Sequence, residues 1–220
     1  MDKLINNFES GNSSSDGNSK SGANAVTIWF LTQNAHKVSE GKEALKNYPR
    51  VRLEQLNVPK HEDKDDSLPD AMKEIAVAAA VNGAKEYNRM VVAEDAGIFF
   101  EAFNDFPGMN TKWIMNKIGY DGILALLNGK NRKAYFRTVL ALASPDGNCK
   151  VFEGIVRGEI TDKVYGEDVN CMDYDRIFAP EGSDVPFALM MGDKTHMSHR
   201  YRAFCKLGEY LSGSDEKRKL

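Results

Sequence analysis

A polar loop directly after an apolar run is the first place where this sequence could do chemistry. Thr32, Asn34 and Lys37 follow the β-rich run Val26–Leu31, a pattern typical of a strand that ends in a phosphate-binding loop. The segment Lys37–Leu45 favours a helix start, so backbone N–H groups and the Lys37 ammonium would face one anion together. A match this short equally fits a plain polar turn between a strand and a helix.

Two adjacent carboxylates form a second candidate group. Glu94 and Asp95 follow the apolar run Arg89–Ala93, and α/β enzymes commonly place ligands at the carboxyl ends of strands. Because neighbouring residues of a strand point to opposite faces, we expect only one of the two to face a cleft. A solvated pair of loop carboxylates is the alternative interpretation.

A third polar group, Ser198, His199 and Arg200, lies near the C-terminus. We interpret Ser198 as the N-cap of a final helix. A serine nucleophile is rejected, because neighbouring side chains at a helix start diverge and the sequence places no partner acid for a triad.

The elements that must position these groups alternate between strand and helix patterns. We expect further strands at Arg50–Val58, Gly97–Phe103, Lys133–Ala143 and Cys149–Ile160, and helices after Pro69, over Lys112–Leu127 with a break near Gly119, and over Met197–Leu211. The helix after Pro69 has an apolar face of Met72, Ile75, Ala76, Ala79 and Ala80. This alternation is typical of an α/β domain.

Composition bounds the class of protein. The chain has 220 residues and a net charge of −3, which fits one domain and gives no electrostatic footprint for a nucleic-acid polymer. We expect a disordered Ser/Gly-rich leader over 1–24, a domain over 25–212 and a charged tail over 213–220. No apolar stretch approaches a membrane span. The three scattered cysteines suit reduced thiols in the cytoplasm.

Six more motifs follow the Thr32–Lys37 loop. They are Glu94-Asp95-Ala96-Gly97, Phe106-Pro107-Gly108, Lys112-Trp113, Phe152-Glu153-Gly154, Tyr174-Asp175-Arg176-Ile177-Phe178 and Ser198-His199-Arg200. In this order and spacing, from about Val26 to about Leu211, the chain resembles the inosine triphosphate pyrophosphatase family, also called Ham1. The resemblance implies Mg²⁺-dependent hydrolysis of non-standard purine nucleoside triphosphates (ITP, dITP, XTP) to the monophosphate and diphosphate. It also implies a homodimer and an elongated mixed central sheet, flanked by helices in two lobes with a cleft between them.

The resemblance also assigns roles to individual residues. Asp95 would hold Mg²⁺ and activate water, with Glu94 as a further metal candidate, and Lys37 would act with Asp95 in catalysis. Lys37 and Lys112 would bind the triphosphate, while Thr32 and Asn34 supply neutral hydrogen bonds to it. The nucleotide and its base would be held by Lys194, Asp175, His199 and Arg200, with Met172 and Tyr174 lining the base pocket.

Three departures from the family pattern fall on functional positions. Lys60 stands where the family has a metal-binding carboxylate, Ala79 where it has a helix lysine, and Met172-Asp173 where it has an aromatic residue and glycine. In one interpretation neighbouring groups compensate, with Glu62 or Asp63 entering the metal shell. In a second, the chain binds nucleotide with little or no turnover. In a third, it is a dimeric interaction protein that kept only the fold.

Overall fold

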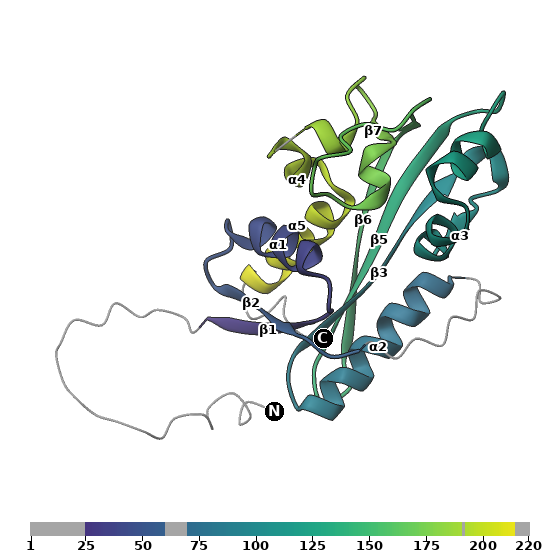
Figure 1. The fold of residues 1–220 in the computed structure, drawn as a ribbon. Coiled ribbons are helices and arrows are strands. Elements are labelled where there is room, and N and C mark those ends of the chain that lie inside the picture. Colours follow the sequence, from purple (N-terminus) through teal and green to yellow (C-terminus); the bar gives the residue numbers. More distant parts are fainter. Residues whose placement is uncertain (1–24, 60–69, 191, 214–220) are drawn as a thin grey trace, which may run out of the picture.

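The computed structural model describes residues 25–59, 70–190 and 192–213. The predicted leader, the acidic loop that contains Lys60 and Glu62, and all of the predicted tail except Gly213 lie outside these ranges. The described residues form one mixed seven-stranded sheet with the strand order β2-β1-β3-β5-β6-β7, and β4 pairs with β3 (Figure 1). This confirms the predicted α/β class with an elongated mixed sheet flanked by helices.

The strands are β1 (Val26–Leu31), β2 (Val51–Leu56), β3 (Val91–Phe100), β4 (Pro107–Gly108), β5 (Lys133–Ala143), β6 (Cys149–Ile160) and β7 (Phe178–Pro180). The α-helices are α1 (Ala35–Leu45), α2 (Ala71–Tyr87), α3 (Thr111–Leu126), α4 (Asp193–Met197) and α5 (His199–Ser212). Three short 3-10 helices are η1 (Glu101–Phe103), η2 (Asp173–Arg176) and η3 (Phe187–Leu189). The predicted bounds of β5 and β6 are confirmed.

The sheet forks at β3. This strand is parallel to β1 only at the pairs Trp29–Val91 and Phe30–Val92, whereas it pairs antiparallel with β5 along its whole length to Phe100. The prediction that the strand ends before Glu94 is therefore wrong, and the expected second strand from Gly97 is the continuation of β3. Beyond Val92 the β1 side of β3 has no strand partner among the described residues until β4 pairs at Ile98, and this gap in the sheet positions the site.

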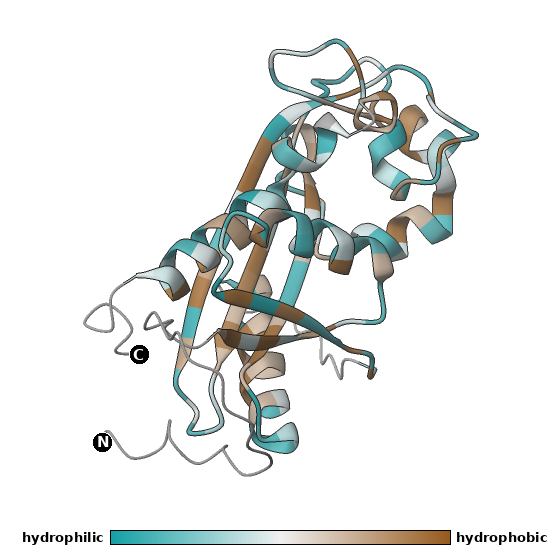
Figure 2. Ribbon diagram, turned by 90° about the vertical axis from the view of Figure 1, so that its left-hand side faces the viewer, coloured by the Kyte–Doolittle hydropathy of each residue, from teal (hydrophilic) through white to brown (hydrophobic). Residues whose placement is uncertain are grey.

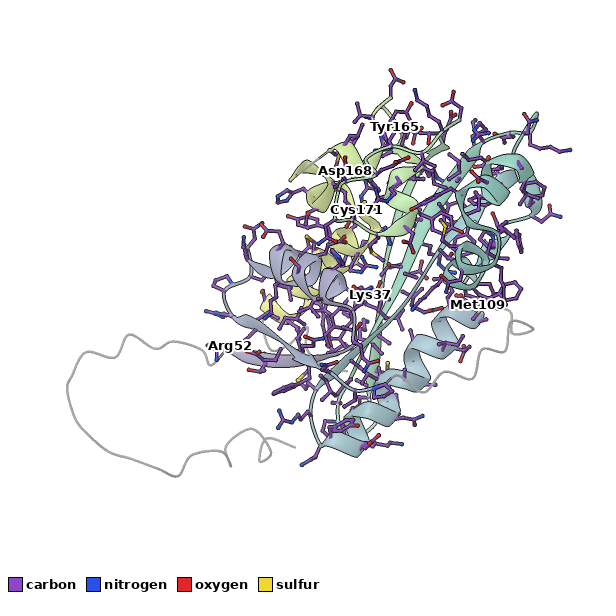
Figure 3. All side chains as sticks on the ribbon, viewed as in Figure 1. Lys37, Arg52, Met109, Tyr165, Asp168 and Cys171 are labelled. Atoms are coloured by element: carbon purple, nitrogen blue, oxygen red, sulfur yellow. The ribbon has the colours of Figure 1, made fainter. Side chains whose placement is uncertain are left out.

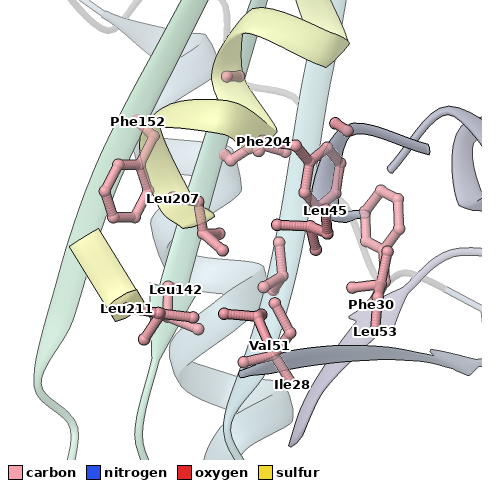
Figure 4. Packing of buried hydrophobic residues seen from close by; sticks show 14 of the residues in the cluster. Ile28, Phe30, Leu45, Val51, Leu53, Leu142, Phe152, Phe204, Leu207 and Leu211 are labelled. Carbon is pink, nitrogen blue, oxygen red and sulfur yellow. The ribbon is translucent and has the colours of Figure 1, made fainter. Parts of the chain in front are cut away.

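Helices cover both faces of the sheet. On one face, α1 and α5 enclose a core that includes Ile28, Phe30, Leu53 and Phe204 (Figure 4). On the other, α2 packs against a core that includes Leu31. Alternate residues of β1 thus enter different cores, as strand geometry requires. Along most of β6 buried residues alternate with more exposed ones, and the long strands carry both hydrophilic and hydrophobic residues (Figure 2).

One expected helix is interrupted, and another begins later than expected. Gly119 has φ 60° and ψ −169° inside α3, which confirms the predicted break, because glycine adopts positive φ without a Cβ clash. The predicted C-terminal helix Met197–Leu211 is α5 and begins at His199, because the extended conformation of Ser198 separates it from Met197, the last residue of α4. Its side chain accepts a hydrogen bond from the Tyr201 N–H at 3.0 Å, so Ser198 caps α5 as predicted.

Two motif glycines allow close backbone approach. A Cβ on Gly97 would lie 2.2 Å from the carbonyl oxygen of Gly108, and a Cβ on Gly154 would lie 1.8 Å from that of His199. Gly97 therefore lets β4 reach β3, and Gly154 lets the start of α5 rest directly on β6. None of the helices in the described ranges is long and apolar enough to cross a membrane.

Candidate active site

A cavity of about 590 Å³ opens where the sheet forks. Of the thirteen site residues predicted from the sequence, all but Glu62, which lies outside the described residues, line this cavity: Thr32, Asn34, Lys37, Glu94, Asp95, Lys112, Met172, Tyr174, Asp175, Lys194, His199 and Arg200. Figure 3 labels three of the lining residues, Lys37 on α1, Met109 before α3 and Cys171 before η2. The cavity is thus assembled from segments far apart in the sequence.

The loop after β1 is ordered by its own side chains. The Asn34 carboxamide oxygen accepts from the backbone N–H groups of His36 at 2.9 Å and Lys37 at 3.3 Å. Asn34 is therefore the N-cap of α1, and the prediction that these N–H groups face an anion is wrong. The Thr32 hydroxyl accepts from the Asn34 N–H at 3.2 Å. Its own proton remains for donation into the cavity, because a hydroxyl both donates and accepts.

The same loop is tied to β2 by a side chain that the sequence analysis missed. Gln55 donates from Nε2 to the carbonyl oxygen of Thr32 at 2.9 Å. Gln55 gave no sequence signal beyond its place near the end of a strand.

Glu94 is deeply buried and lies among cations. Its carboxylate accepts from Arg200 Nε at 2.9 and 3.0 Å, and its Oε2 lies 3.7 Å from Lys37 Nζ. Burial alone would raise the pKa of Glu94, but the charges of Arg200 and Lys37 outweigh burial and lower it to about 2. Glu94 is therefore ionised at neutral pH and balances cations. Its metal role stays a prediction.

Glu40, which the sequence analysis missed, connects the predicted residues. It lies on the buried side of α1, and its carboxylate accepts from Lys194 Nζ at 3.0 Å, Ser198 Oγ at 3.0 Å and Arg200 Nη1 at 2.9 Å. Burial alone would raise the pKa of Glu40, but the charges of Arg200 and Lys194 lower it to about 2. Ser198 therefore donates a hydrogen bond to a carboxylate that the sequence analysis did not place beside it.

Lys194 is shared between two carboxylates. Its ammonium lies 2.5 Å from Asp175 Oδ2 in addition to its contact with Glu40. Asp175 Oδ2 also accepts from the backbone N–H of Met172 at 3.0 Å. Burial raises the pKa of Asp175 despite the nearby Lys194 charge, because Glu40 competes for the same cation. The Asp175 carboxyl therefore holds a proton more readily than a surface aspartate.

Arg200 is almost completely buried beneath the cavity and is held at both ends. Nε and Nη2 contact Glu94, Nη1 contacts Glu40, and Nη1 also lies 3.8 Å from Met172 Sδ. A guanidinium carries five N–H bonds in one plane, so fixing three nitrogens against two carboxylates sets the direction of the rest. The N–H bonds of Arg200 therefore point in fixed directions.

His199 lies flat on an aromatic ring at the cavity wall. Its imidazole stacks on Phe136 with a centroid distance of 4.6 Å and an angle of 6° between the planes. Burial, helped by the Arg200 charge, lowers the pKa of His199 to about 3. Among the described residues Nδ1 has no hydrogen-bond partner. His199 thus offers the cavity a neutral imidazole, and Phe136 is a lining residue that sequence reasoning missed.

This burial predicts an acid-sensitive fold. The imidazole of His199 has a pKa of 6.5 in the unfolded chain and about 3 in the folded chain. Between these two values only the unfolded chain is protonated at this residue, so the free energy of unfolding decreases as the pH is lowered through that range. Between pH 7 and 5 the wild type should lose about 2 kcal/mol of unfolding free energy more than His199→Gln. Urea denaturation at both pH values measures this, with His196→Gln on exposed α4 as the control. Equal losses in wild type and His199→Gln would contradict the assignment.

Asp95 lines the cavity from β3, and Lys112 lines it from α3. Asp95 is buried within the antiparallel ladder, opposite Val139, whereas Lys112 is exposed in the first turn of α3. Among the described residues no cluster of three or more His, Cys, Asp or Glu could hold a metal by itself. Mg²⁺ commonly binds one or two carboxylates together with substrate phosphates, so Asp95 fits such an ion only in partnership with a phosphate ligand.

Two sulfur-containing residues line the part of the cavity wall just before η2, where the sequence analysis noted the loss of an aromatic residue. Met172 and Cys171 line the cavity before η2, while the Tyr174 hydroxyl donates to the carbonyl oxygen of Thr111 at 3.2 Å. Tyr174 is thereby fixed against the start of α3. A flexible thioether adapts to an irregular surface, so Met172 can contact a planar ligand without the stacking geometry of a ring.

Comparisons with known proteins agree with this geometry. The sequence model of the Ham1 family matches residues 28–210. The chain is 40% identical over 195 residues to a dITP/XTP pyrophosphatase of Saccharolobus solfataricus, covering 87% of this chain and 97% of the relative. It is 37% identical to a dITP/XTP pyrophosphatase of Methanopyrus kandleri, covering 86% and 98%.

Solved structures give the same result. The Ham1 protein of Staphylococcus aureus superposes with a TM-score of 0.69 at 26% identity, covering 86% of this chain and all of that one (100%). The HAM1 protein of Coxiella burnetii superposes with a TM-score of 0.70 at 25% identity, covering 85% and 98%.

Proposed function

Because this chain belongs to the Ham1 family, we propose that it hydrolyses ITP, dITP and XTP to the nucleoside monophosphate and diphosphate with Mg²⁺. The observation that carries this proposal is the convergence of the described predicted residues on one cavity at the fork of the sheet. An interaction protein that kept only the fold would have no reason to retain a buried, charge-balanced network there.

The phosphate end of the substrate would lie between α1 and α3. Lys37 and Lys112 supply positive charge from these two helices, and the Thr32 hydroxyl donates between them. Lysine acts as a compact point charge that can follow a phosphate as it leaves. The Asn34 carboxamide nitrogen provides a further donor, because only the oxygen of that group is used in capping.

Asp95 would carry the proton transfer. Its carboxylate accepts a proton from a water whose oxygen bonds to the α-phosphorus, the bond between the α-phosphorus and the α-β bridging oxygen breaks, and diphosphate leaves with that electron pair. Lys37 and Lys112 hold the charge that accumulates on the diphosphate. A bound Mg²⁺ on Asp95 would supply charge neutralisation on the phosphate oxygens.

The buried polar side chains of His199, Arg200 and Asp175 would recognise the purine base of the substrate. His199 and Arg200 donate toward the 6-keto oxygen of hypoxanthine or xanthine, and Asp175 accepts from a ring N–H. An adenine amino group would set a donor against these donors. A site built to hydrogen-bond one group discriminates against its absence by about 10⁴ or more, because buried polar groups are then left unpaired.

The test is a product-resolved screen. We expect Mg²⁺-dependent release of diphosphate from ITP and XTP, detected as phosphate after added pyrophosphatase, with much slower turnover of ATP; GTP and dUTP are screened alongside. Chromatography should show IMP as the product of ITP. Release of orthophosphate together with IDP would refute the reaction type. Binding of ITP without turnover would identify a degenerate member, and absence of binding would favour the interaction protein.

We also propose a homodimer in the cytoplasm, as the family resemblance implies. All three cysteines are free thiols in the structure, which is consistent with a reducing compartment. Analytical ultracentrifugation of the full chain tests the dimer.

A further inference from the structure

Thr138 is a completely buried hydroxyl behind the cavity. It lies on β5 opposite Ala96, and its Oγ1 donates to Glu94 Oε1 at 3.2 Å. It does not line the cavity, so it has no part in the substrate contacts proposed above. A buried threonine in a strand core is an unusual choice where Val would fill nearly the same volume, and its bond to a carboxylate gives the reason.

The position of Glu94 is not set by its cations alone. Arg200 Nε lies at nearly equal distances from both carboxylate oxygens, 2.9 and 3.0 Å, and Lys37 lies 3.7 Å from Oε2. Arg200 Nη2 also lies 2.9 Å from Oε1, so these cations fix the carboxylate only as firmly as their own long side chains are fixed. Thr138 contacts only Oε1 and is held by the β5 backbone, with a β-branched side chain whose rotamer is restricted. It therefore anchors Oε1 from a rigid strand, whereas Arg200 and Lys37 reach the carboxylate through long side chains.

The orientation of the Glu94 carboxylate sets the orientation of the Arg200 guanidinium. Arg200 is fixed between Glu94 and Glu40, and the remaining N–H directions of its planar group follow from these two contacts. A rotated Glu94 would turn the guanidinium away from the site where a 6-keto oxygen binds.

We propose that Thr138 is a positioning residue for base selectivity, acting through Glu94 on Arg200. This inference rests on the proposed function, since it concerns discrimination between 6-keto and 6-amino purines at the same cavity. It differs from a packing role, because loss of the hydroxyl should change selectivity and not merely lower all turnover equally.

The experiment compares Thr138→Val with Thr138→Ser. The measured quantity is the ratio of kcat/KM for ITP to kcat/KM for ATP, accompanied by Tm. Thr138→Val should lower this ratio roughly tenfold, as expected for loss of a hydrogen bond to a charged group. Thr138→Ser keeps the hydroxyl and should stay within about twofold of wild type. Thr27→Val on β1 makes the same chemical change away from the cavity lining and should leave the ratio unchanged.

An unchanged ratio in folded Thr138→Val, or an equal loss in the Ser and Val variants, would overturn the inference. If Thr138→Val does not fold, Thr138→Ala replaces it in the comparison with Ser. The ITP-to-ATP ratio is also measured as equilibrium binding. A wild type that binds but does not hydrolyse refutes the proposed reaction while the binding ratio still decides the role of Thr138. A wild type without preference for ITP overturns both.

Discussion

Asp95→Asn should lower kcat for ITP by on the order of 10³, because it removes both the proton acceptor and the charge that a cation needs. The fold should survive, since the two side chains have the same shape and the backbone of Asp95 stays paired with Val139 in the β3-β5 ladder. The measurement is steady-state turnover of ITP at several Mg²⁺ concentrations, together with Tm.

The matched control is Asp121→Asn, which removes an exposed carboxylate from α3 outside the cavity lining. It should leave both turnover and the Mg²⁺ midpoint unchanged. If folded Asp95→Asn retains more than about a tenth of the wild-type rate, the loss is below about 1.4 kcal/mol. Asp95 would then not be the principal metal and proton-accepting residue.

Glu40→Gln should strongly destabilise the fold. It removes the charge that Lys194 and Arg200 share, leaving buried cations partly uncompensated while keeping the side-chain volume. Breaking a buried ion pair from one side costs about 3–5 kcal/mol. Turnover of ITP should fall as well, since Arg200 loses one of its two fixed contacts. Chemical denaturation and kcat/KM measure the two effects.

Glu43→Gln is the control for this substitution. Glu43 lies on the same helix α1 and pairs only with the exposed Lys46 among the described salt bridges, three residues along the helix. A surface pair of this kind is worth about 0–1 kcal/mol. Similar losses of unfolding free energy in the two variants would show that Glu40 is not the buried centre of the network.

Local features of the fold followed from short-range rules. The bounds of β5 and β6 come from β-rich runs with a turn between them, the kink of α3 from Gly119, and the start of α5 from the Ser198 cap. Each depends on neighbours within a few residues, so the sequence carries the necessary information at that position.

Glu40 illustrates what a sequence pattern conceals. It stands in a polar segment of α1 and has the form of an ordinary surface glutamate. One signal could have found it: Lys37, Glu40, Gly41 and Ala44 have the spacing of one helix face, and small residues at two of these positions indicate close packing. A Cβ on Gly41 would indeed lie 2.8 Å from Leu53.

The sequence by itself determined which residue types could bind a purine triphosphate, because the motifs are local and their order is retained along the chain. It could not determine which of these residues form ion pairs with one another. Strand alternation predicted that only one of Glu94 and Asp95 faces the cleft, yet both line the cavity, which lies where β1 ends at Leu31 while β3 continues. Which of the two carboxylates meets Arg200 depends on contacts between β3, β5, α1 and α5. Such contacts between distant segments exist only once the tertiary structure has formed.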